Sequence, residues 1–342
     1  MSPDDVYLQP TPAGVPDPVN GVLPIPQPNV DPLSHVLAAL DLTQLDEHTF
    51  AAPSMPFLLG RIYGGQVLGQ AMIAAGRTTP DDGDGPRGLH SCHGYFLRPG
   101  RTDGPVRFEV ENLHDGRSFS SRRVHAIQHG EPILSVIASF QESQPGREHQ
   151  SVMPATHAPE LLPSGFELFA TVEHPAAKFL AATGAFDVRH VSGNMYLHPA
   201  PDQQARQQVW LRARSGVDAD DDQLLHRALL IYACDQVMLE PVLRRHGLAW
   251  MHEGISIASL DHSMWWYRNV DINQWHLFDQ YSPSAQGGRG LGITHIYDAS
   301  GRLVATAAQE GMVRTPQDGQ KHADPDVPID GAESRGVPNF DS

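Results

Sequence analysis

The sequence has few cysteines and no long apolar run, and both absences narrow the class of protein. Only two cysteines, Cys92 and Cys234, occur in 342 residues, and no CxxC pair is present. A disulfide framework is therefore not expected, and a reducing cytoplasm is the natural compartment. No apolar stretch reaches the roughly 20 residues that a membrane-spanning helix needs, and the first residues lack the basic and apolar regions of a signal peptide.

Basic residues are scarce as well. The chain contains 24 Lys+Arg against 40 Asp+Glu, which gives a formal net charge of −16. Because nucleic acids and anionic membranes are bound through basic surfaces, neither is an expected partner. The 19 histidines include no HExxH string, and His90 and His93 lie in a strand-like stretch where they would point to opposite faces. We therefore expect no metal site and no cofactor.

Composition divides the chain into five parts. Residues 1–32 are rich in Pro, Gly, Asn and Asp and predict a poorly ordered arm, whereas residues 315–342 predict an acidic, disordered tail. Residues 144–165 are polar and Pro-rich, which is typical of a linker. Two globular parts remain, 33–143 and 166–314.

Each globular part has helical periodicity followed by strands separated by turn signals. In the first part the pattern predicts helices over 33–45 and 65–75 and strands over 89–97, 106–113, 118–129 and 133–141. In the second part it predicts a short helix over 176–182, a strand over 209–213, a buried helix over 222–242 and strands over 254–268, 275–282, 290–297 and 303–313.

The two parts repeat one plan. Each has a buried helix followed by antiparallel strands, and the last strand ends in a Gln-Glu pair, at Gln141-Glu142 and at Gln309-Glu310. A sheet wrapped around one central helix accounts for this order of elements. The predicted fold class is therefore α+β, a double hotdog with two antiparallel sheets, each around a long central helix, paired edge to edge.

One carboxylate belongs to the second buried helix. Residues 228–234 (ALLIYAC) are apolar on every side, which is typical of a buried helix, and Asp235 follows them. An ionised carboxylate in such a place is costly unless it is hydrogen-bonded. From the helix alone two explanations stay open: a buried Asp bonded to local donors, or a catalytic base.

Two strands of the second part place polar side chains on the face directed at this helix. Alternation puts Ser259 and Asp261 on one face of their strand, and Leu303 and Gln309 on one face of the strand 303–313. Alone, the serine or the amide is best explained by a hydrogen bond to a neighbouring group. Together with Asp235 they form a hydrolytic set of acid, hydroxyl and amide that can fix and activate a water.

These residues also lie in strings that resemble the acyl-CoA thioesterase II family. The order of motifs is complete from about residue 33 to 314, in GGQVLGQAMIAA (64–75), LHSCHGYFLRPG (89–100), DGRSFSSRRVHAIQHGEPI (115–133), ASFQE (138–142), IASLDHSMWWYR (257–268) and ATAAQEGMVR (305–314). The resemblance implies hydrolysis of acyl-CoA thioesters to free fatty acid and CoA. It also implies a catalytic trio at Asp235, Ser259 and Gln309, with Ser in place of the commoner Thr.

Further site residues are predicted for the oxyanion and for CoA. Gly65 and Gln66, at the open N-terminus of the first buried helix, are expected to supply backbone N–H groups to an oxyanion. Because CoA carries phosphates, we expect contact with the arginine group Arg98, Arg117, Arg122 and Arg123, although strand arginines are more often simply solvated. The resemblance further implies a homo-oligomer, a dimer or a tetramer.

Two other functions remain open. A hotdog-fold enoyl-CoA hydratase needs an Asp and a His over the acyl tunnel, and the one close pair, Asp261-His262, falls within a strand with its members on opposite faces. A non-catalytic acyl-CoA-binding protein would keep the fold, but it has no need for all three polar residues of the trio.

Overall fold

A computed structural model describes residues 15, 17–26, 30–80, 87–218 and 222–315. Of the predicted tail 315–342, residues 316–342 fall outside the described residues, and so does most of the predicted arm. The helices are α1 (Pro32–Leu40), α2 (Gly64–Gly76), α3 (Gly165–Ala170), α4 (Pro175–Thr183), α5 (Gln223–Cys234) and α6 (Glu240–Arg245), with 3-10 turns η1 (Leu58–Gly60) and η2 (Pro159–Leu161). None of these described helices is long and apolar enough to cross a membrane.

Strands of the described residues form one twisted antiparallel sheet. In chain order they are β1 (Thr43–Gln44), β2 (Thr49–Ala52), β3 (Gly88–Phe96), β4 (Val106–Asp115), β5 (Phe119–Gln128), β6 (Glu131–Gln141), β7 (Phe186–His190), β8 (Arg206–Ala213), β9 (Ser256–Ser259), β10 (Asp261–Trp266), β11 (His276–Gln286), β12 (Arg289–Asp298) and β13 (Leu303–Arg314). Their spatial order is β1-β2-β4-β5-β6-β3-β10-β13-β12-β11-β8-β7, and β9 pairs with β13.

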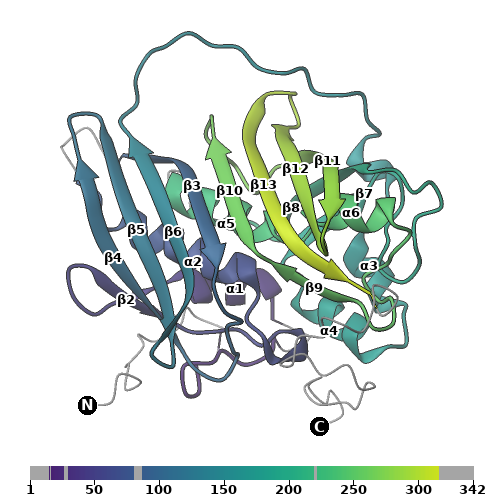
Figure 1. The fold of residues 1–342 in the computed structure, drawn as a ribbon, viewed down its shortest axis with the longest axis horizontal. Coiled ribbons are helices and arrows are strands. Elements are labelled where there is room, and N and C mark those ends of the chain that lie inside the picture. Colours follow the sequence, from purple (N-terminus) through teal and green to yellow (C-terminus); the bar gives the residue numbers. More distant parts are fainter. Residues whose placement is uncertain (1–14, 16, 27–29, 81–86, 219–221, 316–342) are drawn as a thin grey trace.

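The sheet consists of two halves that meet at one pair of strands. The first half ends at β3 and the second begins at β10, and these two strands pair antiparallel with Ser263 opposite His93. Figure 1 shows the blue strands of the first half continuing into the green and yellow strands of the second. The predicted double hotdog, joined edge to edge, is confirmed.

The central helices α2 and α5 pack against each other behind the sheet. Glycines on α2 allow the close approach: a Cβ on Gly65 would overlap the carbonyl oxygen of Tyr232, and one on Gly76 would overlap the side chain of Leu224. Both helices belong to one core that joins the two halves, since its buried residues come from both. Asp222 begins α5, because its side chain accepts from the N–H of Leu225.

The helix predicted over 222–242 is interrupted in the structure. It ends at Cys234, and a turn over 235–239 connects it to α6. Pro241 has no N–H, so it cannot donate to the carbonyl of Val237, and the N–H of Glu240 makes this bond instead. The break places Asp235 at the C-terminal end of α5 rather than near the middle of a continuous helix.

Two predicted strands also differ from the structure. The strand predicted over 254–268 is divided at Leu260 into β9 and β10, so Asp261 does not continue the face of Ser259. In β13 the register shifts between the pairs Ile296–Ala305 and Tyr297–Leu303. This irregularity turns Leu303 to the outer face, against the prediction that it shares a face with Gln309.

Smaller differences concern the ends of the two globular parts. The helix predicted over 33–45 stops at Leu40, because the chain then forms β1. Strand β7 was not predicted. The segment 144–165 follows the outer face of the second half, where Ser151 bonds the Tyr297 hydroxyl at 2.8 Å and the carbonyl of His157 accepts from the Trp210 indole at 2.9 Å.

One residue of the N-terminal arm is anchored to the first half. Leu23 is fully buried, its N–H donates to the carbonyl of Ser54 at 2.9 Å, and it packs with Ala38 and Ala39 of α1 and with Met55. Val19 of the same segment is exposed, and the predicted disorder of the arm stays a prediction.

Candidate active site

Asp235 lies where elements of both halves meet. Its Oδ2 accepts from the backbone N–H of Gly65, at the N-terminus of α2, at 2.8 Å. Its Oδ1 accepts from Ser259 Oγ at 3.2 Å and from Gln309 Nε2 at 2.8 Å. The structure therefore brings the three predicted catalytic side chains together, with donors from α2, β9 and β13 converging on one half-buried carboxylate.

Glycines let the strands of the second half approach the turn that follows α5. A Cβ on Gly292 would overlap the carbonyl oxygen of Met238, and one on Gly311 would overlap the Leu239 side chain. Gly311 pairs with Ser259 across β13 and β9. The missing side chains thus set the short distance from the strands to Asp235.

The donors and acceptors of Asp235, Ser259 and Gln309 fix the orientation of the Gln309 amide. An ionised carboxylate only accepts, so the amide group that faces Asp235 must be the NH₂ of Gln309. That NH₂ has two hydrogens, which go to Asp235 Oδ1 and to Ser259 Oγ, both at 2.8 Å. The single hydroxyl hydrogen of Ser259 goes to Asp235. Oδ1 thus accepts two hydrogen bonds, whereas Oδ2 accepts one and keeps a free lone pair.

The predicted oxyanion donors are placed at this site but are engaged elsewhere. The N–H of Gly65 donates to Asp235, and the N–H of Gln66 donates to the carbonyl of Tyr63 at 3.1 Å. The Gln66 side chain is buried and bonds the segment before η1, through Pro53 and Met55. The N-terminus of α2 thus faces the carboxylate, as the helix dipole favours, and the oxyanion role stays a prediction.

Tyr63 joins the two central helices beside the site. Its hydroxyl donates to the carbonyl of Tyr232 at 2.7 Å, and the two rings lie 5.0 Å apart. Burial, and then the nearby charge of Asp235, raise the pKa of Tyr63 well above its ordinary value. The phenol is therefore protonated at neutral pH and remains a donor.

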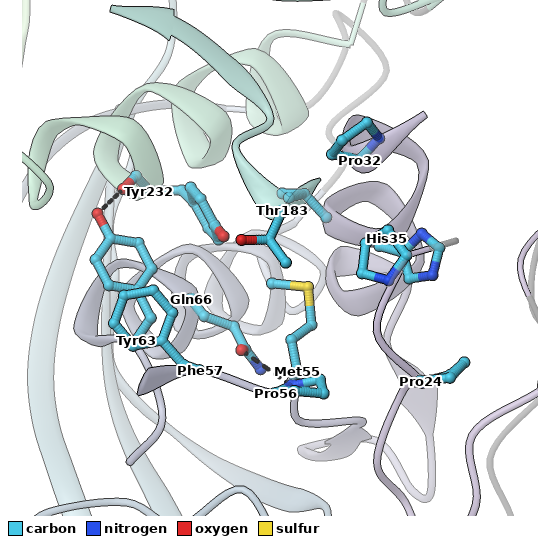
Figure 2. A pocket seen from close by; sticks show the side chains of 12 residues that line it. Pro24, Pro32, His35, Met55, Pro56, Phe57, Tyr63, Gln66, Thr183 and Tyr232 are labelled. Atoms are coloured by element: carbon cyan, nitrogen blue, oxygen red, sulfur yellow. Dashed lines mark hydrogen bonds between the residues drawn. The ribbon is translucent and has the colours of Figure 1, made fainter. Parts of the chain in front are cut away.

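A pocket opens next to these two tyrosines (Figure 2). Its empty space amounts to about 450 Å³ when the open solvent at its mouth is included. Figure 2 shows Tyr63, Phe57 and Met55 along one side and Tyr232 and Thr183 along the other. Further lining residues come from the N-terminal segment and α1, namely Pro24, Pro26, Pro32, His35 and Val36. A largely apolar hollow thus lies at the end of α2 that faces Asp235.

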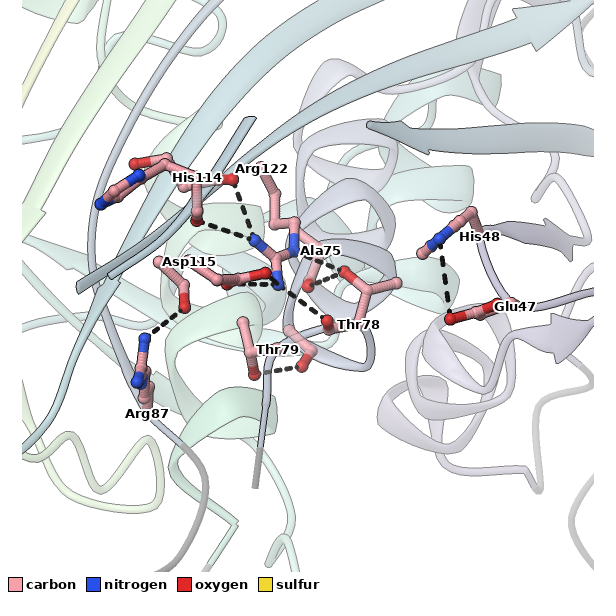
Figure 3. A network of polar contacts seen from close by, with 12 residues as sticks. Glu47, His48, Ala75, Thr78, Thr79, Arg87, His114, Asp115 and Arg122 are labelled. Carbon is pink, nitrogen blue, oxygen red and sulfur yellow. Dashed lines mark hydrogen bonds and ion pairs between the residues drawn. The ribbon is translucent and has the colours of Figure 1, made fainter. Parts of the chain in front are cut away.

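The four predicted CoA-binding arginines lie in different environments. Arg122 is fully buried, and Figure 3 shows its guanidinium between Asp115, Thr78 and the carbonyl of His114. Its bonds tie the β4–β5 hairpin to the end of α2 opposite Asp235. The prediction that Arg122 contacts CoA is therefore wrong: its donors are used inside the protein.

The other three arginines are at the surface. Arg123 pairs with Glu111 at 3.0 Å on the outer face, and Arg117 is exposed in the β4–β5 hairpin. Arg98 pairs with Glu131 at 3.0 Å and follows β3 by two residues. The last residue of β3, Phe96, lies 3.0 Å from the position of a Cβ on Gly64, so Arg98 belongs to the end of the sheet nearest Asp235.

The pair required by the hydratase alternative is not assembled. Asp261 accepts from the N–H of Glu310 at 2.8 Å, whereas the His262 ring points inward and lies 2.6 Å from Gln309 Oε1. Among the described residues no group of three or more His, Cys, Asp or Glu is placed to hold a metal ion.

Sequence reasoning missed Tyr63 and His262 as neighbours of the trio, whereas helical spacing does place Tyr232 on the same side of its helix as Asp235. Tyr63 precedes the Gly-Gly pair and gave no sign that it lies beside the site. His262 did offer a signal, because it lies in the same string as Ser259, but alternation within a strand does not reveal which side chain it meets.

A two-halved hotdog with one converging set of acid, hydroxyl and amide defines a class of hydrolase, and the comparisons with known proteins agree. Residues 186–312 match the family model for acyl-CoA thioesterase, and residues 53–141 match that for the acyl-CoA thioesterase N-terminal domain. The chain is 35% identical over 290 residues to acyl-CoA thioesterase 2 of Haemophilus influenzae, covering 83% of this chain and 98% of that protein. The chain therefore belongs to the acyl-CoA thioesterase family.

Solved structures support the same conclusion. The acyl-CoA thioesterase II TesB2 of Mycobacterium marinum superposes with a TM-score of 0.66 at 38% identity, covering 84% of this chain and 99% of that chain. A hot dog fold protein of unknown function from Alicyclobacillus acidocaldarius gives a TM-score of 0.67 at 16% identity, covering 82% and 98%. The second likeness concerns the fold alone.

Proposed function

We propose that the protein hydrolyses acyl-CoA thioesters to a free fatty acid and CoA, with Asp235 as the general base. One observation supports this most: a single half-buried carboxylate accepts hydrogen bonds from Gly65, Ser259 and Gln309, which belong to three separate elements. Membership of the thioesterase family supplies the reaction class. The three donors hold the carboxylate in one orientation and leave one lone pair on Oδ2 for a water.

The water is bound through its own hydrogens. Because the amide hydrogens of Gln309 and the hydroxyl hydrogen of Ser259 are already donated, a water can donate one hydrogen to Asp235 and the other to Ser259 Oγ. Its free lone pair then points to the thioester carbonyl. Gln309 fixes the other two groups rather than the water itself.

In the proposed reaction, one proton moves from the water to Asp235 and then to the departing thiolate. Asp235 takes a proton from the water as the oxygen attacks the carbonyl carbon, and the carbonyl oxygen becomes an oxyanion. When the oxyanion collapses, the C–S bond breaks and the departing thiolate of CoA takes the proton from Asp235. The products are the free acid and the thiol, and the carboxylate is restored.

The acyl chain is proposed to bind in the pocket beside Tyr63 and Tyr232. Its apolar side chains, Met55 and Phe57 among them, suit a hydrocarbon, and it lies at the same end of α2 as Asp235. The phosphates of CoA require basic side chains, and Arg98 is the one of the four predicted arginines at this end of the sheet. Assembly as a homo-oligomer and a cytoplasmic location remain predictions.

The test is thiol release from a panel of acyl-CoAs of different chain length, with the wild-type protein and Asp235→Asn. An amide cannot accept the proton, so turnover should fall by ~10²–10⁴ while the fold remains. Cys92 and Cys234 are buried, and burial raises the pKa of Cys92 to about 12, so a thiol reagent should not react with the native protein.

A matched control is Asp261→Asn. The Asp261 carboxylate lies next to the site, at the start of β10, but it accepts from the N–H of Glu310 and not from the trio. Turnover of the same order as wild type is expected. Hydration of a 2-enoyl-CoA without thiol release would support the hydratase alternative, and binding of acyl-CoA without either reaction would support a non-catalytic protein.

A further inference from the structure

His262 is the buried polar side chain in contact with the trio that the mechanism above does not use. It lies on β10, the strand of the second half that pairs with β3 of the first, and it has no exposed surface. Its Nδ1 lies 2.6 Å from Gln309 Oε1. A histidine buried in this way needs a reason, because burying polar groups is costly unless they are bonded.

The protons of this contact can be assigned from the trio. Since the NH₂ of Gln309 faces Asp235 and Ser259, its carbonyl oxygen faces His262 and can only accept. His262 must therefore donate from Nδ1. Burial, the largest cause, lowers the pKa of His262, so the ring is neutral at pH 7 with its proton on Nδ1. Its Nε2 is buried and has no partner among the described residues.

We infer that His262 is a positioning residue: its Nδ1–H fixes the amide of Gln309 in the one orientation that donates to Asp235 and Ser259. This inference rests on the proposed function. If the amide turned by half a rotation, its oxygen would face the carboxylate, and the trio would lose two of its three mutual hydrogen bonds. The Nδ1–H disfavours that orientation because an NH₂ facing it would leave two donors opposed.

The first test compares two substitutions that differ in the hydrogen bond they allow. Asn places an amide nitrogen near the position of Nδ1 and can still donate, whereas Leu cannot. We expect His262→Leu to lower kcat by ~10–100-fold, because the amide is no longer held in its productive orientation, with KM little changed. His262→Asn should restore most of kcat.

A matched control is His276→Leu. His276 is likewise a buried histidine of the second half whose Nδ1 bonds one oxygen, the carbonyl of Gln274, but it has no contact with the trio. Both Leu variants should lose thermal stability, and only His262→Leu should lose kcat. If His262→Leu does not fold, His262→Phe retains a flat ring without a donor and takes its place.

A double-mutant cycle with Gln309→Ala separates positioning from a general loss of packing. Once the amide is absent, removing His262 should lower kcat no further, so the two effects should be strongly non-additive. Additive losses, wild-type kcat in folded His262→Leu, or equal losses in the Leu and Asn variants would each overturn the inference. Failure of the proposed function itself looks different, since the wild-type protein would then release no thiol.

Discussion

The two hotdog halves share one plan but use their buried polar residues differently. In the first half, the central helix α2 turns Gln66 and Gln70 to the carbonyls of Pro53 and Ala39, so these side chains hold α1 and the segment before η1 in place. In the second half, the end of α5 presents Asp235 to donors from three elements. Repetition of a fold therefore did not repeat the site.

The corresponding Gln-Glu pairs make the same contrast. Glu142 pairs with Arg87 and Glu310 with Arg289, so the glutamates are used alike. Gln309 is fully buried and belongs to the trio, whereas Gln141 is only half-buried at the end of β6. The halves are nevertheless not independent, because Asp235 also requires the N–H of Gly65 from the first half.

Replacing the two glutamines tests this contrast most strongly. Gln309→Ala should lower kcat by ~10²–10³, because both Asp235 and Ser259 lose a preorganised donor. Gln141→Ala removes the corresponding side chain of the first half and should leave thiol release of the same order as wild type. Equal losses in the two variants would mean that the first half shares in catalysis and that the contrast is wrong.

Acid should destabilise the second half through its buried histidines. Burial lowers the pKa of His276 to about 4, whereas an unfolded histidine has a pKa near 6.5. Between these values the unfolded chain binds more protons, so stability present above pH 6.5 is lost as the pH falls toward 4. The loss from this residue amounts to about 3 kcal/mol.

Fluorescence can report this loss from the second half alone, since all five tryptophans lie there, at Trp210, Trp250, Trp265, Trp266 and Trp275. Urea unfolding followed by fluorescence should show a smaller fall in the free energy of unfolding between pH 6.5 and 4 in His276→Asn than in wild type. An identical fall in both proteins would remove His276 as the cause. Circular dichroism of the same samples follows both halves together.

Adding one methyl group at Gly65 should disrupt the contact between the two central helices. Gly65→Ala places a Cβ against the carbonyl of Tyr232 and the ring of Tyr63, so the helices must separate, and we expect a loss of ~1–3 kcal/mol in the free energy of unfolding. Turnover should fall too, because the N–H of Gly65 moves from Asp235. Gly146→Ala is the control, since nothing lies within 4 Å of its added Cβ. Wild-type stability in Gly65→Ala would contradict the packing of α2 on α5.

The sequence predicts which face of a strand a residue occupies, but it does not predict where a strand or a helix is interrupted. Alternation in strands identified the inner faces that hold Ser259 and Gln309, because the period of a strand decides which side chains share a face. Alternation cannot locate a break or a bulge, so Asp261 and Leu303 were assigned to the wrong faces. The division of the helix predicted over 222–242 was missed because helical periodicity does not locate a break either: Pro241 lies inside the predicted range, whereas in the structure it belongs to the first turn of α6.

Long-range contacts were beyond pattern reasoning. Alternation places Arg122 on the face of Val124 and Arg123 on the opposite face, but it does not reveal their partners. One is buried against Thr78 and Asp115, and the other pairs with Glu111 at the surface. Likewise, the role of His262 depends on a residue 47 positions later in the chain. Such assignments need the packing of strands that are distant in sequence.

The smallest expected effect concerns where CoA is held, and two exposed arginines allow a matched comparison. Arg98 and Arg123 each pair with a glutamate at 3.0 Å, but only Arg98 lies at the end of the sheet nearest Asp235. Arg98→Ala should raise KM for acyl-CoA by roughly 5–10-fold with kcat unchanged, because it removes a charge that binds substrate and transition state equally. Arg123→Ala makes the same change in charge on the outer face and should leave KM unchanged.

Since the contact is electrostatic, added salt should raise KM of the wild-type protein more than that of Arg98→Ala. A rise in KM in Arg123→Ala as large as that in Arg98→Ala would contradict the placement of CoA at Arg98, and an unchanged KM in both variants would remove these two arginines from CoA binding.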